Sequence, residues 1–399
     1  MSAMKRLFQL MAEKKASDIF LSVGAPINIK INGNAVPVNQ TVMTAEAVQT
    51  LLYEVLNERQ IKEYEEELEL NTAFALEGVG AFRISAFRQK NSPAVVVRFI
   101  PGSIPPLDSL GVPEVLKEVI MAKRGLILMV GATGSGKSTS LSSMIDYRNE
   151  RKAGHILTLE DPVEFIFQNK KSIVNQREVG TDTKSFNVAL KNALRQAPDI
   201  ILIGEIRDKE TMGMALAYAQ SGHLALATLH ANNSYHAMNR IINFYPLENR
   251  PSLLLDLSAA LQSIISQRLI RTKSGGRMAA VEVLLNTRHI SELIEKGEIN
   301  EIKDALEKSM SPGSQTLEQA LFKLFMDGKI SQEEAMANAD SATNMLWLIN
   351  QATAGDITGQ PPAAAPATPA KEEEKKESIL SPAGGGNASF SSFKIDGVG

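Results

Sequence analysis

The sequence predicts an α/β protein in which a small α+β unit precedes a larger unit built on buried parallel strands. Three observations indicate this fold class. From about residue 113 onward, short continuous apolar runs alternate with helical stretches, as expected for strands covered on both faces of a parallel sheet. A glycine-rich loop follows the first of these runs. Before it, the segment 101–106 contains three prolines and a glycine, which break both the helical and the strand pattern.

The small α+β unit is predicted to be a domain of residues 1–100, followed by a linker at 101–112. Asn32-Gly33 is typical of a tight hairpin turn. Apolar periodicity predicts helices at 4–14 and 44–68 and strands at 27–31, 81–88 and 94–100.

The second domain is predicted to span 113–350. Its buried strands are expected at 126–130, 156–159, 200–203 and 224–228. Near its end, Thr316 and Gln319 form a capping-box pattern that opens a helix, Gly328 can close that helix, and Ser331 opens the next. The remainder, 351–399, is predicted to be a disordered tail, because its Pro/Ala-rich, charged and Gly/Ser-rich stretches bury too little apolar surface to offset the cost of ordering.

Composition excludes several classes of function. The 399 residues include no cysteine, so disulfides, thiolate zinc sites and a cysteine nucleophile are excluded. The net charge of -3 gives no clustered basic excess of the kind that binds nucleic acid, and we expect no nucleic-acid partner. No apolar run approaches the roughly 20 residues of a membrane span, and we expect a cytoplasmic protein.

The segment 131–138 reads GATGSGKS and matches the phosphate-binding pattern G-x-x-x-x-G-K-[ST] in its required context, between an apolar strand and a helix. Lys137 is expected to reach the β- and γ-phosphates of ATP, and the Ser138 hydroxyl to ligate Mg²⁺. The residues expected to bind the nucleotide are Gly131, Thr133, Gly134, Ser135, Gly136, Lys137, Ser138 and Thr139.

Hydrolysis also needs carboxylates near the phosphates, and two follow predicted strands. Glu205 comes after the run 200–203, which is the Walker B arrangement, and Glu164 comes after the run 156–159. A carboxylate at this edge of a sheet can hold the water shell of Mg²⁺ or orient the attacking water. His223 and His230 flank the next strand and could both face the γ-phosphate, but the residues alone favour histidines that the backbone holds at a helix–strand junction.

Five segments, in this order along the chain, carry a family resemblance. They are GATGSGKST (131–139), TLEDPVEF (158–165), NQREVG (175–180), LRQAPDIILIGEIRD (194–208) and SGHLALATLHANN (221–233). They resemble the secretion-superfamily ATPases of type IV pili and type II secretion, in particular the twitching-motility retraction ATPases of the PilT/PilU family and its PilU type. The resemblance implies a PAS-like N-terminal domain and a RecA-like P-loop NTPase domain. It also implies a homohexameric ring at the cytoplasmic face of the inner membrane, under a pilus platform protein, with a paralogous retraction ATPase as a further partner.

The resemblance also assigns roles to single residues. Glu164 matches the Asp-box general base and Glu205 the Walker B glutamate. His230 and His223 match the His box, and His230 is expected to be catalytic. Arg83 and Arg98 match arginines that reach nucleotide, and we expect them to act on ATP held by a neighbouring subunit. Glu164 is preferred over Glu205 as the base, but the residues alone leave the order open.

Two departures from the family pattern leave the function with two readings. The segment 287–295 lacks the basic residues of a motif typical of PilT-type retraction motors, and the absence of cysteine removes the zinc site common in extension motors. The chain is therefore predicted to be either a motor that powers or assists pilus retraction, or a nucleotide-dependent accessory scaffold that modulates a partner motor.

Overall fold

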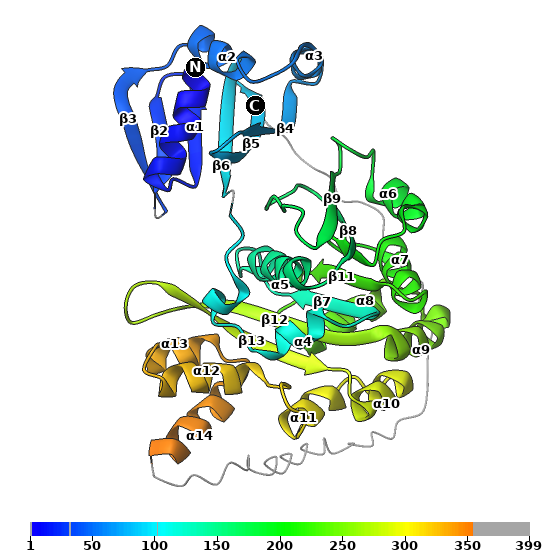
Figure 1. The fold of residues 1–399 in the computed structure, drawn as a ribbon. Helices are drawn as coiled ribbons and strands as arrows, with labels where there is room; N and C mark the ends of the chain where they lie inside the picture. The colour runs from blue at the N-terminus through cyan, green and yellow to red at the C-terminus, as the bar shows by residue number, and fades with distance from the viewer. Residues whose placement is uncertain (1, 32, 102, 354–399) are drawn as a thin grey trace, which may run out of the picture.

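The computed structural model describes residues 2–31, 33–101 and 103–353. The predicted tail lies outside the described residues except for 351–353, which continue the last helix beyond the predicted end of the domain at 350. Figure 1 shows two units, each built on one sheet and joined by a single connection. We call them the N-terminal unit (residues 2–101) and the nucleotide unit (residues 103–353).

The N-terminal unit is a six-stranded antiparallel sheet in the order β3-β2-β1-β6-β5-β4. Helices pack on one face of it, where Phe8, Leu52 and Tyr64 from three different helices share a core with Ile84 of β5. Its elements are α1 (Ala3–Lys14), β1 (Asp18–Ser22), β2 (Pro26–Ile31), β3 (Asn34–Val42), α2 (Ala45–Tyr53), α3 (Glu58–Glu67), β4 (Glu69–Leu76), β5 (Gly80–Gln89) and β6 (Ser92–Pro101).

The helix predicted over 44–68 is two helices, α2 and α3. Asn57 caps the second helix, and its side chain and that of Gln60 form a reciprocal capping box, so a helix start lies inside the predicted span. Strands β1, β3 and β4 were not predicted. β3 is mostly exposed and carries Pro37, so it lacks the alternating pattern that identifies a half-buried strand.

The nucleotide unit is built on a seven-stranded sheet in the order β13-β12-β7-β11-β10-β8-β9. Six strands are parallel, and β13 is antiparallel to β12 at one edge. Its strands are β7 (Gly125–Val130), β8 (Gly154–Glu160), β9 (Ser172–Glu178), β10 (Ile200–Ile203), β11 (Leu224–Leu229), β12 (Leu261–Arg271) and β13 (Arg277–Leu285). The four predicted strands are β7, β8, β10 and β11, and the α/β fold class is confirmed.

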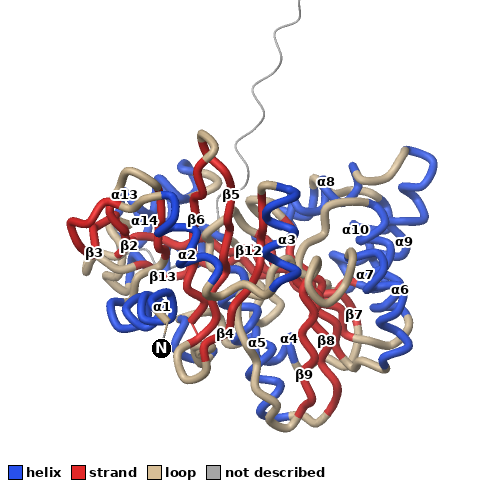
Figure 2. Tube along the Cα trace, turned by 90° about the horizontal axis from the view of Figure 1, so that it is seen from above, coloured by secondary structure: helices blue, strands red, loops and turns tan. Residues whose placement is uncertain are grey.

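Helices cover both faces of this sheet. Figure 2, viewed from above, shows α6, α7 and α9 on one side of β7 and β8, and α5 on the other. Helices α12–α14 form a third cluster against β12 and β13. The helices are α4 (Val115–Ile120), α5 (Lys137–Arg151), α6 (Phe186–Ala193), α7 (Lys209–Gln220), α8 (Ser234–Asn243), α9 (Arg250–Ala260), α10 (Arg288–Lys296), α11 (Glu301–Glu307), α12 (Leu317–Met326), α13 (Gln332–Asn338) and α14 (Ala342–Thr353).

Sequence signals set the ends of the C-terminal helices. Thr316 and Gln319 form the predicted capping box at the start of α12, and Gly328, with φ +70°, follows its end. Ser331 accepts a hydrogen bond from the Glu334 backbone amide at the start of α13. Among the described residues, no helix has the length and apolar character needed to cross a membrane.

The connection between the units is only partly extended. Ile104 and Leu107 pack against the core of the nucleotide unit, and residues 107–110 form a short 3₁₀ helix. The Ser143 hydroxyl of α5 donates a hydrogen bond of 2.7 Å to the Pro105 carbonyl. Part of the predicted linker is therefore fixed to the nucleotide unit.

Candidate functional site

The P-loop joins β7 to α5 at the carboxyl edge of the parallel sheet, where such folds bind ligands. Lys137 is the first residue of α5, and its Nζ donates hydrogen bonds to the Gly131 and Ala132 carbonyls at 2.8 and 2.9 Å. Burial lowers the pKa of Lys137, while the nearby charges of Glu205 and Glu164 act to raise it. A cation, free backbone amides and a helix N-terminus thus converge on one spot, which suits phosphate.

Two glycines of the loop are required by their surroundings. Gly136 has φ +86°, and a Cβ there would lie 2.7 Å from Gln267 Nε2. Gly131 has φ +151°, and its Cβ would lie 2.6 Å from the Gln267 carbonyl oxygen. Gln267 also holds the loop directly, because its Nε2 donates to the Ser135 carbonyl at 2.9 Å and its Oε1 accepts from the Ser140 hydroxyl at 2.8 Å. Strand β12 therefore holds the P-loop and the start of α5 through the Gln267 side chain.

Glu205 follows β10 and is held on both carboxylate oxygens. Arg207 Nε donates to Oε2 at 2.7 Å, and His230 Nε2 lies 3.3 Å from Oε1. Arg207 also lies 3.8 Å from the Asp161 carboxylate, which follows β8. Side chains from the ends of three neighbouring strands are thus tied together, and the orientation of the Glu205 carboxylate is fixed.

Glu164 and Glu160 differ sharply in environment. Glu164 is exposed, so its carboxylate is open to water in the cleft. Glu160 is buried and accepts hydrogen bonds from Thr158 Oγ1 at 2.6 Å and Gln176 Nε2 at 3.2 Å. Burial raises the pKa of Glu160. A water-exposed carboxylate beside the P-loop can accept a proton, whereas Glu160 ties β8 to β9.

Arg83 and Arg98 come from the N-terminal unit. They are direct partners in the antiparallel pairing of β5 with β6, so two like charges face each other on one surface of the sheet. The neighbours of Arg83 in β5, Phe82 and Ile84, point into the helix-covered core, which places Arg83 on the opposite face. Arg98 Nε is paired with the buried Asp18 at 2.9 Å. Opposed like charges are unfavourable unless an anion lies near them.

One cleft of about 590 Å³ brings these groups together. Its lining comprises Arg83 and Arg98, the P-loop residues Thr133, Gly134 and Gly136–Thr139, and Glu164, Glu205 and His230. Both arginines line the cleft of their own chain. The expectation that they act on ATP held by a neighbouring subunit concerns a second copy of the chain and stays a prediction.

Two predicted site residues lie apart from the cleft lining. Gly131 and Ser135 belong to the loop but line a smaller hollow behind it.

His223, considered above as a possible phosphate neighbour, precedes β11 and lies at the opposite end of that strand from His230, hydrogen-bonded to Ser221 at 3.0 Å. Only the histidine at the carboxyl edge can reach the nucleotide side.

Gln267, Arg268 and Arg277 were missed by sequence reasoning. Arg277, at the start of β13, lines the cleft, and Arg268 lines the hollow behind the P-loop. They lie about 130 residues after the P-loop in strands that carry no motif, so only the fold shows their place.

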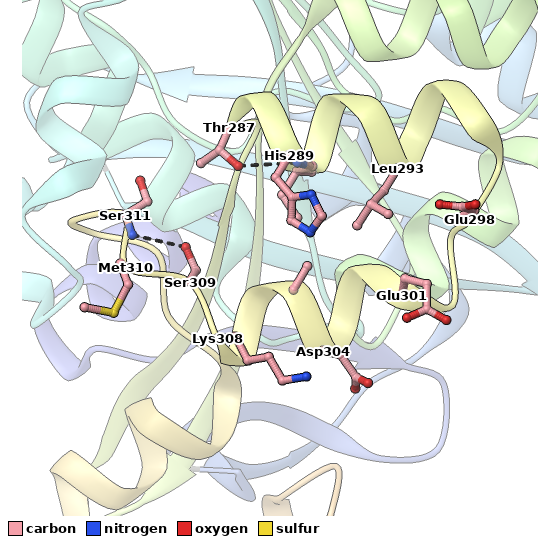
Figure 3. Close-up of a pocket in the computed structure, with 12 residues that line it drawn as sticks. Thr287, His289, Leu293, Glu298, Glu301, Asp304, Lys308, Ser309, Met310 and Ser311 are labelled. Carbon is pink, nitrogen blue, oxygen red and sulfur yellow. Dashed lines mark hydrogen bonds between the residues drawn. The ribbon is translucent and has the colours of Figure 1, made fainter. Parts of the chain in front are cut away.

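A second cavity, of about 740 Å³, contains none of the predicted site residues. Figure 3 shows it between α10 and α11, with His289 and Leu293 on one wall and Glu301 and Asp304 on the other. The segment 287–295, which departs from the PilT-type motif, therefore forms one wall of a surface pocket far in sequence from the P-loop.

A family model and several known proteins match this chain over most of its length. The family model described as Type II/IV secretion system protein matches residues 2–337. The chain belongs to this family. It is 48% identical over 353 residues to the "Type IV pilus ATPase PilU" of Pseudomonas aeruginosa, an alignment that covers 88% of this chain and 92% of that protein. It is 42% identical to the "Type IV pilus retractation ATPase PilT" of the same organism, over 85% of this chain and 98% of that one.

Solved structures agree with this placement in the secretion family. The "Crystal Structure of the Pilus Retraction Motor PilT and Bound ADP" matches with a TM-score of 0.80 at 40% identity, covering 86% of this chain and 98% of that one. The Legionella pneumophila ATPase DotB matches with a TM-score of 0.73 at 26% identity. This member of the family is thus a nucleotide-using ATPase, and the predicted two-part fold is confirmed.

Proposed function

We propose that this chain is a Mg²⁺-dependent ATPase that powers or assists retraction of type IV pili. The observation that carries the proposal is one cleft that unites most of the P-loop, two carboxylates and two opposed arginines in a chain similar to PilU and PilT.

The cleft has the charge distribution that phosphoryl transfer requires. Negative charge concentrates on the γ-phosphate and the leaving oxygen in the transition state. Lys137 supplies a positive charge from the P-loop, and the facing sheet adds the guanidinium groups of Arg83 and Arg98, the latter paired with Asp18. Guanidinium groups suit this task because their planar fork binds phosphate oxygens and stays charged at any working pH.

The residues fit a magnesium ion. Mg²⁺ in nucleotide sites is held by one or two protein oxygens together with phosphates and water, so a dedicated cluster of side chains is not required. Ser138 and Glu205 line the same cleft and would supply those oxygens, the carboxylate acting through bound water. When bound, the ion neutralises charge on the β- and γ-phosphates.

Glu164 is assigned as the general base and Glu205 as the metal-side carboxylate. Each oxygen of the Glu205 carboxylate already has a nitrogen partner, from Arg207 or His230. Glu205 is therefore better suited to orienting the hydrated metal ion than to accepting a proton. Glu164 is exposed and carries its charge close enough to influence Lys137. It can therefore take the proton of an attacking water.

The working unit is proposed to be a homohexameric ring at the cytoplasmic face of the inner membrane, in contact with a pilus platform protein. A paralogous retraction ATPase is a further candidate partner. The family membership and the PilT-like fold support this assembly, and residues 1–100 and 113–350 would be its two domains.

A nucleotide-dependent accessory scaffold is the second candidate function, and the segment 287–295 favours it. This segment carries Glu295 where the PilT-type motif is basic, and its Glu292 is paired with Arg288 at 3.0 Å. Such a chain would use ATP to change its own shape while a partner motor does most of the work.

Phosphate release by the purified chain, together with pilus retraction in cells, tests both candidates. The motor requires magnesium-dependent ATP turnover, and Lys137→Ala should remove retraction along with turnover. A Glu164→Gln chain, which should bind ATP without turnover, would favour the scaffold if it restores retraction in cells lacking the wild-type chain, but only when a partner ATPase is intact. Absence of both turnover and nucleotide binding would contradict both candidates.

A further inference from the structure

We propose that Arg268 and Asp340 are positioning residues for ATP hydrolysis, because they clamp the loop that carries His230 to the C-terminal helices. The inference rests on the proposed function and extends it to two residues outside the lining of the cleft. It begins from β12, where the adjacent residues Gln267 and Arg268 project to opposite faces of the sheet. Gln267 supports the P-loop, and Arg268 reaches the loop on the other side.

The loop in question, residues 230–233, joins β11 to α8 and is short. Arg268 donates from Nη2 to the Asn232 carbonyl at 3.2 Å, and the Ser266 hydroxyl donates to the same carbonyl at 3.1 Å. Asn233 caps α8, since its Oδ1 accepts from the His236 amide at 2.8 Å. Its other side-chain atom, Nδ2, donates to Asp340 Oδ2 at 2.6 Å. The loop is therefore held at two successive residues by groups from outside it.

Asp340 links this loop to the last described helices. It lies between α13 and α14, and its second carboxylate oxygen accepts from Arg268. Arg268 also donates from Nη1 to the Asn338 carbonyl at 2.5 Å, at the end of α13. The side chains of Arg268 and Asp340 are only 24% and 17% exposed. Solvent screens such a pair less than it screens a surface pair, so removing one partner leaves an uncompensated charge.

The clamp bears on catalysis through His230. His230 is two residues before Asn232 and lies 3.3 Å from Glu205 Oε1, so a shift of the loop carries the imidazole away from the carboxylate. Misplacement by 1 Å at a catalytic group can cost about 10²-fold in rate. The P-loop is supported separately by Gln267, so ATP binding should survive loss of the clamp.

Steady-state ATP hydrolysis by the full chain tests the proposal. Asp340→Asn removes one charge at nearly constant shape and should lower kcat by about tenfold or more, with KM for ATP changed less than threefold. Arg268→Lys should act similarly, because ammonium cannot contact Asn232, Asn338 and Asp340 together. The matched control is Glu292→Gln, which breaks the exposed Arg288–Glu292 pair and should leave kcat unchanged.

A double-mutant cycle separates positioning from general loss of stability. If Asp340 acts through His230, Asp340→Asn should have little further effect on kcat in a His230→Ala background, whereas a purely structural loss would add to it. Unaltered kcat in Asp340→Asn, additive losses, or wild-type kcat in His230→Ala would each overturn the clamp. Lack of turnover in the wild-type chain would instead contradict the proposed function, which keeps the two failures distinct.

Discussion

Lys137, Glu164 and Glu205 share one cleft but are held in different ways. Lys137 is buried with its ammonium on two loop carbonyls, Glu205 is fixed between Arg207 and His230, and Glu164 is exposed. These environments imply different consequences when each side chain is neutralised.

Lys137→Ala should reduce kcat by roughly 10²–10³ or more and weaken ATP binding, because the phosphates lose a charge that the loop is built around. Phosphate release and fluorescent ATP binding measure the two effects. Lys296→Ala, an exposed lysine at the end of α10, is the control and should behave as the wild type. Normal turnover in Lys137→Ala would contradict the P-loop assignment.

Glu164→Gln and Glu205→Gln should both bind ATP and both lose turnover, but they should differ in their need for magnesium. Loss of Glu205 weakens the metal side of the cleft, so Glu205→Gln should require more Mg²⁺ for half-maximal nucleotide binding, whereas Glu164→Gln should not. Titration of Mg²⁺ against ATP binding measures the difference. The opposite order would exchange the roles of the two residues.

At the level of helices and strands, the best predicted elements are those whose residues carry a strong local signal. The strands β7, β8, β10 and β11 are continuous apolar runs, and the capping residues of α12 and α13 are explicit in the sequence. Strand β12 contains Gln262, Ser263, Ser266, Gln267 and Arg268, which suit no simple period because several of them hold neighbouring loops. Tertiary hydrogen bonds therefore define this strand.

The same contrast applies to the site. The P-loop, Glu164 and Glu205 follow from a motif and from strand ends, so local reasoning finds them. Arg83 and Arg98 needed the family resemblance, because a charged residue on a strand of a distant sheet looks like an ordinary surface group. Their opposition across β5 and β6 emerges only from the register of the pair.

Glu282 of β13 gives a pH-dependent prediction for the contact between β13 and α8. It is buried, its carboxylate accepts from the Ser234 backbone amide at 2.7 Å, and Asp340 and Glu318 lie near enough to add negative charge. Burial raises the pKa of Glu282 to about 7. The folded chain thus retains a proton that the unfolded chain releases near pH 4.5, so this stabilising contribution is complete below that pH and is lost as the pH rises through 7.

Glu282→Gln should therefore stabilise the chain relative to the wild type at pH 8, by up to about 3 kcal/mol, and much less at pH 5. The glutamine carbonyl can still accept from Ser234, so the cap of α8 is kept. Thermal unfolding at the two pH values measures the effect. An equal change in Tm at both would show that the carboxylate does not titrate between them.

At the scale of the whole molecule, the main question is whether a site is complete within one chain. Arg83 and Arg98 line the same cleft as Lys137 of their own chain. Arg83→Ala should lower kcat by roughly 10³-fold, as for other arginines that stabilise phosphoryl transfer. Mixing Arg83→Ala with Lys137→Ala chains distinguishes the two arrangements, because a site complete within one chain gives no recovery when no chain in the mixture carries both residues. Recovery on mixing would show that the arginine serves a neighbouring subunit.

Removal of residues 355–399 should leave ATP turnover and assembly intact, since their low-complexity composition offers little apolar surface for packing. A chain that ends at Ser341 is the contrast, because it also loses the buried Met345 and Ile349 of α14 and should be several kcal/mol less stable. Turnover and the sedimentation of both truncations measure the outcome. An inactive or monomeric 1–354 chain would contradict the prediction.

The hydrogen bond from Ser143 to Pro105 fixes the connection between the two units to helix α5. Ser143 lies six residues after Lys137 in α5, about 9 Å along the helix axis, so the chain leaving the N-terminal sheet is pinned close to the phosphate-binding loop. In any turn of the N-terminal unit about this hydrogen bond, β3, at the far edge of the sheet, would travel farther than the arginine pair of β5 and β6, because β6 leads directly into the connection.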